Sequence, residues 1–151
     1  MSPAGEDGFT LLELIVVMAI VGLLAVALQT FRIGGNATLE LDRATGAMTD
    51  GLRQVQSEAI FRHRENVFGI DVERRRFRPG RDPKPVELAD AIDISFTTAR
   101  EERLGDSTGQ IRFFPDGSST GGRIMLALGN RQNVIKIDWL TGLISVTAHV
   151  R

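Results

Sequence analysis

Few side chains in this sequence of 151 residues could carry out chemistry near neutral pH. The sequence contains no Cys and no Tyr, and its two histidines are His63 and His149. Without Cys there is no disulfide, no thiolate nucleophile and no Cys-ligated metal, and two histidines offer little for general acid–base catalysis. Asp116 and Ser118 could be combined with either histidine as a hydrolase triad, but no G-x-S-x-G nucleophile elbow is present. We therefore expect no catalytic residue, no cofactor and no small-molecule substrate.

Phosphate and metal sites are also not indicated. The segment Gly117–Gly122 reads GSSTGG, but Arg123 and a predicted strand follow it, whereas a phosphate-binding loop requires a Lys and the start of a helix. We expect this segment to be a flexible, exposed hairpin loop that can contact a partner. The acidic residues are scattered and lack the spacing of a calcium-binding loop. Examples are Asp71, Asp82, Asp93, Asp106 and Asp116.

The charge pattern gives little reason to expect nucleic-acid binding. The formal net charge is −1, which excludes binding by bulk positive charge. One basic cluster, formed by Arg74, Arg75, Arg76 and Arg78 with Arg62 and Arg64 nearby, could contact DNA phosphates. Glu65, Asp71 and Glu73 dilute that charge. A solvated hairpin, or a contact with an acidic patch on a neighbouring subunit, is the favoured interpretation.

A long apolar run lies near the start of the chain. Residues 9–31 read FTLLELIVVMAIVGLLAVALQTF and carry no charge from Leu14 to Phe31. As a helix this run spans roughly 35 Å, which exceeds a bilayer core of about 30 Å. A core helix usually shows a polar stripe, and residues 14–28 show none. The sequence therefore predicts a membrane-spanning helix at 9–31.

Glu13 is unusual because it lies at the start of that lipid-soluble run. A charge deep in a bilayer costs about 2.5–3.5 kcal/mol or more, so a carboxylate there is expected to have a partner or to stay wet at the interface. The preceding MSPAGEDG has Glu6 and Asp7 but no Lys or Arg, unlike a secretory signal peptide. The A-x-A pattern at residues 25–27 leaves a signal peptide as the competing interpretation.

The hexapeptide GFTLLE at residues 8–13 resembles the processing site of type IV pilins and type II secretion pseudopilins. The resemblance implies that residues 1–8 are a prepilin leader, that a prepilin peptidase cleaves between Gly8 and Phe9, and that the amine of Phe9 is methylated. It also implies that Glu13 meets the Phe9 amine of a neighbouring subunit when helices pack into a fibre. The acidic leader departs from the family, whose leaders usually carry a basic residue.

The charges of an amine at Phe9 and a carboxylate at Glu13 agree with the four-residue spacing between these residues. A free amine at Phe9 has a usual pKa of about 7.7–8.0 and is mostly cationic at neutral pH. Glu13 follows four residues later, about one helical turn away, and an ammonium is the natural complement of a carboxylate in lipid. A pair within one chain is the alternative to a pair between subunits.

The segment at 32–65 changes character and is predicted to be an amphipathic helical stalk. Its apolar residues recur every three or four positions over 37–64, which indicates a helix that buries one face. They are Leu41, Ala44, Met48, Leu52, Val55 and Ala59. Gly34-Gly35-Asn36 is a weak point where the stalk is either continuous with the membrane helix or kinked from it, and it is also a candidate hinge.

Residues 66–151 are predicted to form a β-rich globular domain. A hairpin is expected from Val67–Val72 and Arg76–Arg78, with a turn at residues 73–75. Loops are expected at 79–90 and 99–109, and strands at 92–97, 110–114, 123–128, 133–139 and 143–149, with turns at 116–117, 129–130 and 141–142. The fold class is therefore α+β, a long helix on a mostly antiparallel sheet. Trp139 is expected in the core, with an interface anchor as the alternative.

The second half of the chain narrows the resemblance to one group of these pilin-like proteins. Residues 111–124, 134–138 and 140–146, together with 53–63, resemble minor pseudopilins of the H type, a group that also includes FimT- and FimU-like minor pilins. The implied fold is type IV pilin-like. The implied function is that of a minor pseudopilin of a type II secretion system in the bacterial inner membrane, with its globular domain in the periplasm. Implied partners are the prepilin peptidase and the major and other minor pseudopilins. Two alternatives are a type IV minor pilin that contacts DNA, and a periplasmic enzyme or binding domain on a signal anchor.

Overall fold

The computed structural model describes residues 11–81, 83–98 and 107–150, without the side chains of residues 27–37. The chain divides into two compact units, Met1–Asn36 and Ala37–Arg151. A single helix, α1 (Leu11–Phe61), contributes to both units. α1 continues through Gly34 and Gly35, in line with the continuous alternative; a hinge there stays a prediction.

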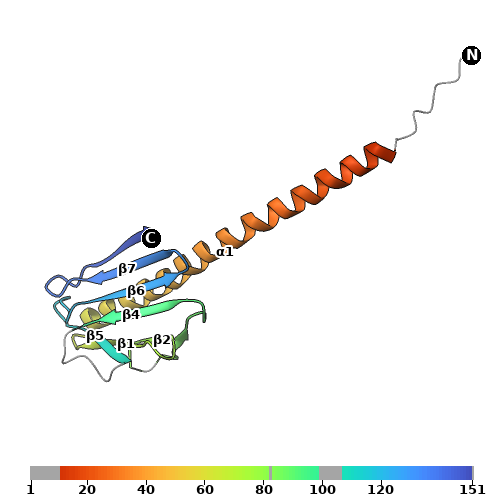
Figure 1. Cartoon of the computed structure of the whole chain (residues 1–151). Coiled ribbons are helices and arrows are strands. Elements are labelled where there is room, and N and C mark those ends of the chain that lie inside the picture. Colours follow the sequence, from red (N-terminus) through yellow and green to blue (C-terminus); the bar gives the residue numbers. More distant parts are fainter. Residues whose placement is uncertain (1–10, 82, 99–106, 151) are drawn as a thin grey trace, which may run out of the picture. The chain divides into compact units, whose positions relative to one another are not determined.

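The described residues of the second unit form eight strands, all paired antiparallel in two sheets (Figure 1). One sheet has the order β3-β2-β1-β5 and the other β4-β6-β7-β8. Their bounds are β1 Asn66–Asp71, β2 Arg76–Pro79, β3 Val86–Glu87, β4 Asp93–Thr97, β5 Thr108–Phe113, β6 Gly122–Leu128, β7 Arg131–Ile137 and β8 Ile144–Val150. The predicted α+β class is confirmed, and the strands form two sheets where one had been expected.

The strands form two sheets because β4 and β5 each pair with a strand that is not their neighbour in the sequence. β4 does not join the sheet of β1 and β2 but pairs with β6, so that Phe96 lies opposite Ile124. β5 then returns to β1 and places Ile111 opposite Phe68. Neither pairing is visible in local periodicity, because each joins segments separated by other strands.

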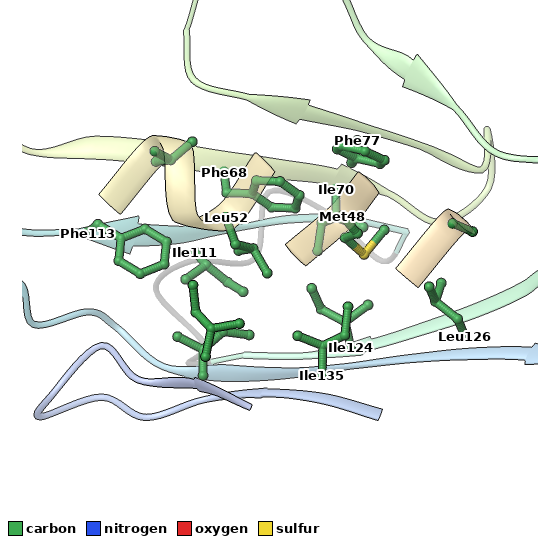
Figure 2. Packing of buried hydrophobic residues seen from close by; sticks show 14 of the residues in the cluster. Met48, Leu52, Phe68, Ile70, Phe77, Ile111, Phe113, Ile124, Leu126 and Ile135 are labelled. Carbon is green, nitrogen blue, oxygen red and sulfur yellow. The ribbon is translucent and has the colours of Figure 1, made fainter. Parts of the chain in front are cut away.

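The buried face of α1 is the predicted one. All six apolar residues of the predicted stripe are at most 7% exposed, and they pack in one cluster with residues of both sheets (Figure 2). Figure 2 shows Met48 and Leu52 of the helix among Phe68 and Ile70 of β1 and other labelled core side chains. Spacings of three and four residues put these side chains on one helical face.

Polar groups on the buried side of α1 have hydrogen-bond partners within the helix and on β7. The hydroxyls of Thr45 and Thr49 each donate to the carbonyl four residues earlier, at 2.7 Å. The amide of Asn133, 5% exposed on β7, donates to Asp42 Oδ1 at 3.2 Å and to Thr45 Oγ1 at 3.0 Å. Since an unsatisfied buried polar group destabilises a fold, these bonds link the helix to β7 at a defined register.

The predicted hairpin and turns are confirmed in position. β1 and β2 form the hairpin, with Arg75 at φ 47° in the turn. Gly117, Gly129 and Gly142 have φ values of 88°, 62° and 64°, in the region that favours glycine. The predicted 79–90 loop differs in two respects: Pro79 is the last residue of β2, and Val86–Glu87 form the short strand β3, which pairs with β2.

Candidate processing and assembly site

The processing residues Gly8 and Phe9 lie outside the described residues. Glu13 is described, and it lies in the first turn of α1 with an exposed side chain. In the sequence, Glu13 lies four residues after Phe9, and in the structure it lies in the first described turn of α1.

Apolar side chains surround Glu13 on α1. Twelve large apolar residues between Leu11 and Val26 are 46–77% exposed. They occupy nearly consecutive positions and therefore cover the whole circumference of the helix, rather than one stripe. An apolar surface of this extent indicates that something outside the isolated chain covers it.

In the described part of the chain, no helix is both long enough and apolar enough to cross a membrane. Of the expected span 9–31, residues 9 and 10 and the side chains of residues 27–31 lie outside the description.

Two turns of the second unit are held together by one glutamine of α1. Gln56 Nε2 donates to the carbonyl of Gly117 at 3.0 Å and to the carbonyl of Gly142 at 3.1 Å. Gly142 lies so close to the carbonyl of Gly117 that an added Cβ would collide with it. The turn that joins β7 and β8 is therefore attached both to the helix and to the turn before β6.

Asp138 organises that β7–β8 turn. Its Oδ1 accepts bonds from the backbone N–H of Thr141 at 2.9 Å, from the Thr141 hydroxyl at 2.9 Å and from the N–H of Leu140 at 3.1 Å. These hydrogen bonds, chiefly those from Thr141, lower the pKa of Asp138 because they stabilise its charged form. The turn consequently has a defined conformation.

The expected core position of Trp139 is wrong. Trp139 is 66% exposed, and Leu140 and Leu143 of the same turn are 63% and 65% exposed. The reason is that β7 ends at Ile137, so Trp139 lies beyond the alternating pattern of the strand and its backbone follows the turn. The alternative interpretation, an interface anchor, stays a prediction.

The expectation of a flexible exposed loop at Gly117–Gly122 is also wrong. Ser119 is only 4% exposed; its N–H donates to the carbonyl of Trp139 at 2.9 Å, and its hydroxyl donates to the carbonyl of Asp138 at 3.0 Å. Gly117 and Gly121 are buried as well. Glycine and serine content suggested exposure, but small residues also allow close backbone packing, which is their role here.

Asp116 and Ser118, which the sequence does not support as members of a hydrolase triad, form a local turn. Ser118 donates to Asp116 Oδ1 from its N–H at 3.0 Å and from its hydroxyl at 2.6 Å, and these bonds lower the pKa of Asp116. Among the described residues, neither His63 nor His149 is hydrogen-bonded to this pair. The described part of the chain also contains no group of three or more His, Asp or Glu residues arranged to hold a metal ion.

The basic hairpin is partly neutralised by acids of its own domain. Arg76 Nε lies 3.2 Å from Asp71 Oδ2, and Arg75 Nη1 lies 3.6 Å from Asp90 Oδ1. Arg74 and Arg78 are exposed. Arg62 and Arg64, which the sequence placed with this cluster, instead line a separate cavity together with Arg81.

In comparisons with known proteins, two family models match two successive parts of the chain. The family model for the prokaryotic N-terminal methylation motif matches residues 4–28, and the model described as type II transport protein GspH matches residues 44–141. Type II secretion system protein H of Xanthomonas campestris pv. campestris is 34% identical over 136 residues, which are 89% of this chain and 79% of that protein.

Two solved structures share the fold. The minor pseudopilin EpsH from the type 2 secretion system of Vibrio cholerae matches with a TM-score of 0.55 at 18% identity, over 72% of this chain and 97% of that one. The type IV minor pilin FimU of Pseudomonas aeruginosa, in one crystal form, matches with a TM-score of 0.52 at 10% identity, over 76% and 90% of the two chains. At these identities the likeness shows a common fold.

Proposed function

This chain belongs to the family of type II transport protein GspH, and we propose on that basis that it is a minor pseudopilin. It is a structural subunit of the periplasmic pseudopilus of a type II secretion system, and it helps to export folded proteins across the outer membrane. It performs no catalysis itself. The observation that carries the proposal is that one chain joins an N-terminal methylation motif at residues 4–28 to a GspH-type domain at residues 44–141.

Processing at the N-terminus is the first step of the proposed function. The prepilin peptidase hydrolyses the peptide bond between Gly8 and Phe9, and the new amine of Phe9 is then N-methylated. The methylation-motif match, which includes both residues, supports this assignment. The product is a subunit whose first residue, Phe9, carries a cationic amine four residues before Glu13.

The same N-terminal segment is also proposed to anchor the chain in the inner membrane. The uncharged run from Leu14 to Phe31 in the sequence and the exposed apolar surface of residues 11–26 support a lipid environment before assembly. The second unit then faces the periplasm. Within the fibre, neighbouring major and minor pseudopilins replace the lipid around the apolar helix, and Glu13 pairs with the Phe9 amine of an adjacent subunit.

Mass spectrometry of the mature N-terminus tests the proposal. In cells that express the prepilin peptidase, we expect a first residue of N-methylated phenylalanine at position 9. Gly8→Val should leave the leader uncut, whereas Gly5→Val, a matched change within the leader, should be processed normally. A mature chain that starts at Met1 or at Leu28 would contradict the proposal.

A deletion strain separates the secretion role from a pilus role. We expect the strain to lose export of its secreted proteins and to recover it with the plasmid-borne gene. Loss of pili with normal export would instead assign the chain to the type IV pilus.

A further inference from the structure

A cavity of about 630 Å³ lies at the C-terminal end of α1 and is not used by the proposed function. We call it the arginine pocket, because three arginines from two separate segments contribute to it. Its lining residues are Glu58, Arg62, Arg64, Glu65, Asn66, Arg81 and Pro83.

Two backbone features bring these segments together. α1 ends at Phe61, and the N–H groups of Arg62 and Arg64 continue to bond carbonyls of the last turn, at 2.9 and 3.3 Å. After β2, Gly80 takes a φ of 102°, and its N–H donates to the carbonyl of Val67 at 2.9 Å. This glycine turn directs Arg81 to the cavity of the helix end, since a φ in that region is costly for other residues.

The two glutamates of the pocket are already occupied. Glu58 accepts bonds from the side-chain amides of Asn66, at 3.1 Å, and Gln54, at 3.2 Å. Glu65 accepts a bond from Arg112 Nη1 at 2.9 Å. By contrast, none of the three pocket arginines has an ion pair with a described residue. The pocket therefore offers guanidinium groups to an external anion.

The helix end explains only part of this arrangement. Cations after a helix C-terminus interact favourably with its dipole, which accounts for Arg62 and Arg64. It does not account for Arg81, which comes from the segment after β2. The arginines of the β1–β2 hairpin are different, because Arg75 and Arg76 have acidic partners within their own domain.

The surroundings of the pocket favour a polypeptide over a free anion or a nucleic acid. Phe61 is 86% exposed and borders a second cavity, of about 580 Å³, which shares Glu58 and Arg62 with the pocket. An apolar residue of a peptide fits beside that ring. A chain of phosphates requires an extended basic track, whereas here Glu58 and Glu65 interrupt the positive charge.

We propose that the arginine pocket binds an acidic segment of a neighbouring pseudopilus subunit. A carboxylate of that segment bonds to Arg62, Arg64 and Arg81, as guanidinium groups do with carboxylates, and an apolar residue next to it packs on Phe61. The nature of the partner rests on the proposed function; the chemistry of the pocket does not.

The binding test uses the full-length protein in detergent and a fluorescein-labelled peptide, EELEEL, with QQLQQL as its uncharged analogue. We expect anisotropy to report binding of the acidic peptide alone. Added salt should weaken it, because the screening length falls from about 10 Å at 0.1 M to about 3 Å at 1 M. The double variant R62Q/R81Q should bind about tenfold more weakly, as expected for the loss of charge-assisted bonds.

The matched control is R74Q/R78Q, which removes the same net charge from two exposed arginines outside the pocket. It should change the affinity less than twofold. Equal losses in the two double variants, equal binding of both peptides, or tighter binding of a thymidine decamer with the same dependence on the pocket arginines would each overturn the proposal.

A second measurement separates this proposal from the proposed function. In cells, the charge reversal R62E/R81E should leave the methylated N-terminus intact but reduce co-purification with the other pseudopilins, and thermal unfolding verifies that the variant is folded. A processed variant that co-purifies normally would overturn the pocket alone. An unprocessed wild-type chain would contradict the proposed function, while the peptide titration would still decide on the pocket.

Discussion

Glu13 is the acidic side chain of the first turn of α1, and exposed apolar residues adjoin it along the helix. In a fibre that covers this surface, its carboxylate is transferred out of water, which is costly unless a cation accompanies it. The Phe9 amine that processing creates is that cation in the proposed assembly. The two charges therefore favour one axial register between adjacent helices.

Replacing Glu13 by Ala should reduce incorporation into the pseudopilus. Because the amine is then left without its carboxylate, we expect the incorporated fraction to fall at least about tenfold, or ~1.4 kcal/mol. Quantitative immunoblotting of sheared or cross-linked pseudopili measures it. Glu40→Ala, at another exposed position of α1, should assemble normally, and wild-type incorporation of the Glu13 variant would refute the register role.

Gly142 offers a second test at the scale of one residue. Gly142 and Gly129 have nearly the same φ, 64° and 62°, but an added Cβ at Gly142 would collide with the Gly117 carbonyl, whereas at Gly129 it would meet open space. Gly129→Ala should therefore cost only the backbone strain, about 1–2 kcal/mol. Gly142→Ala should cost more, because the bonds from Gln56 are disturbed as well. Urea unfolding of both variants measures the difference, and equal losses would disprove the close approach.

Among the elements, the β7–β8 turn has a backbone that hydrogen bonds fix while its apolar side chains are exposed to solvent. Asp138 accepts three bonds from the turn, and Ser119 bonds to the backbone of Asp138 and Trp139. The turn thus presents Trp139, Leu140 and Leu143 with little freedom in the backbone. An ordered apolar group of this kind loses less entropy when a partner covers it.

The pKa of Asp138 gives this turn a predicted pH dependence. The folded pKa is lowered from an ordinary value of 3.8, so the charged carboxylate stabilises the fold above that pH. Below 3.8 the unfolded chain takes up the proton first, and the stabilisation is lost as the pH falls through the folded pKa. We expect Asp138→Asn to be less stable than wild type at pH 7 and to lose less stability on acidification below pH 3.8. Thermal unfolding across pH 2–7 measures both, and parallel curves would contradict the prediction.

At the scale of the whole molecule, the two compact units differ in how their apolar residues are covered. Unit 37–151 contains the core cluster, with the helix face from Leu41 to Ala59 packed among both sheets. In the first unit, the described apolar side chains from Leu11 to Val26 are exposed. The second unit therefore has the packing of an independent domain, while the first depends on a surrounding medium.

A chain of residues 37–151 should consequently fold without the N-terminal unit. We expect a soluble protein with cooperative thermal unfolding, as is usual for a small domain with its own core, and with mixed helix and strand signals in circular dichroism. The same chain should not enter the pseudopilus, because it lacks Phe9 and Glu13. Non-cooperative unfolding would show that the core depends on the first unit.

Local patterns predicted much of this protein correctly. The three- and four-residue spacing identified every buried apolar residue of the stripe from Leu41 to Ala59, and glycine located the turns at Gly117, Gly129 and Gly142. Such features depend on residues that are neighbours in the sequence, so periodicity and composition are enough to detect them. The roles that the GFTLLE motif implies for Gly8, Phe9 and Glu13 stay predictions.

The tertiary structure alone decided the rest. The division into two sheets, the exposure of Trp139, the burial of Ser119 and the grouping of Arg81 with Arg62 and Arg64 all depend on segments that are distant along the chain. β1, for example, pairs with β5, so that Asn66 lies opposite Phe113. Which distant segments meet is determined by the shared burial of many apolar side chains and by backbone hydrogen bonding across the strands, and no single stretch of sequence contains that information.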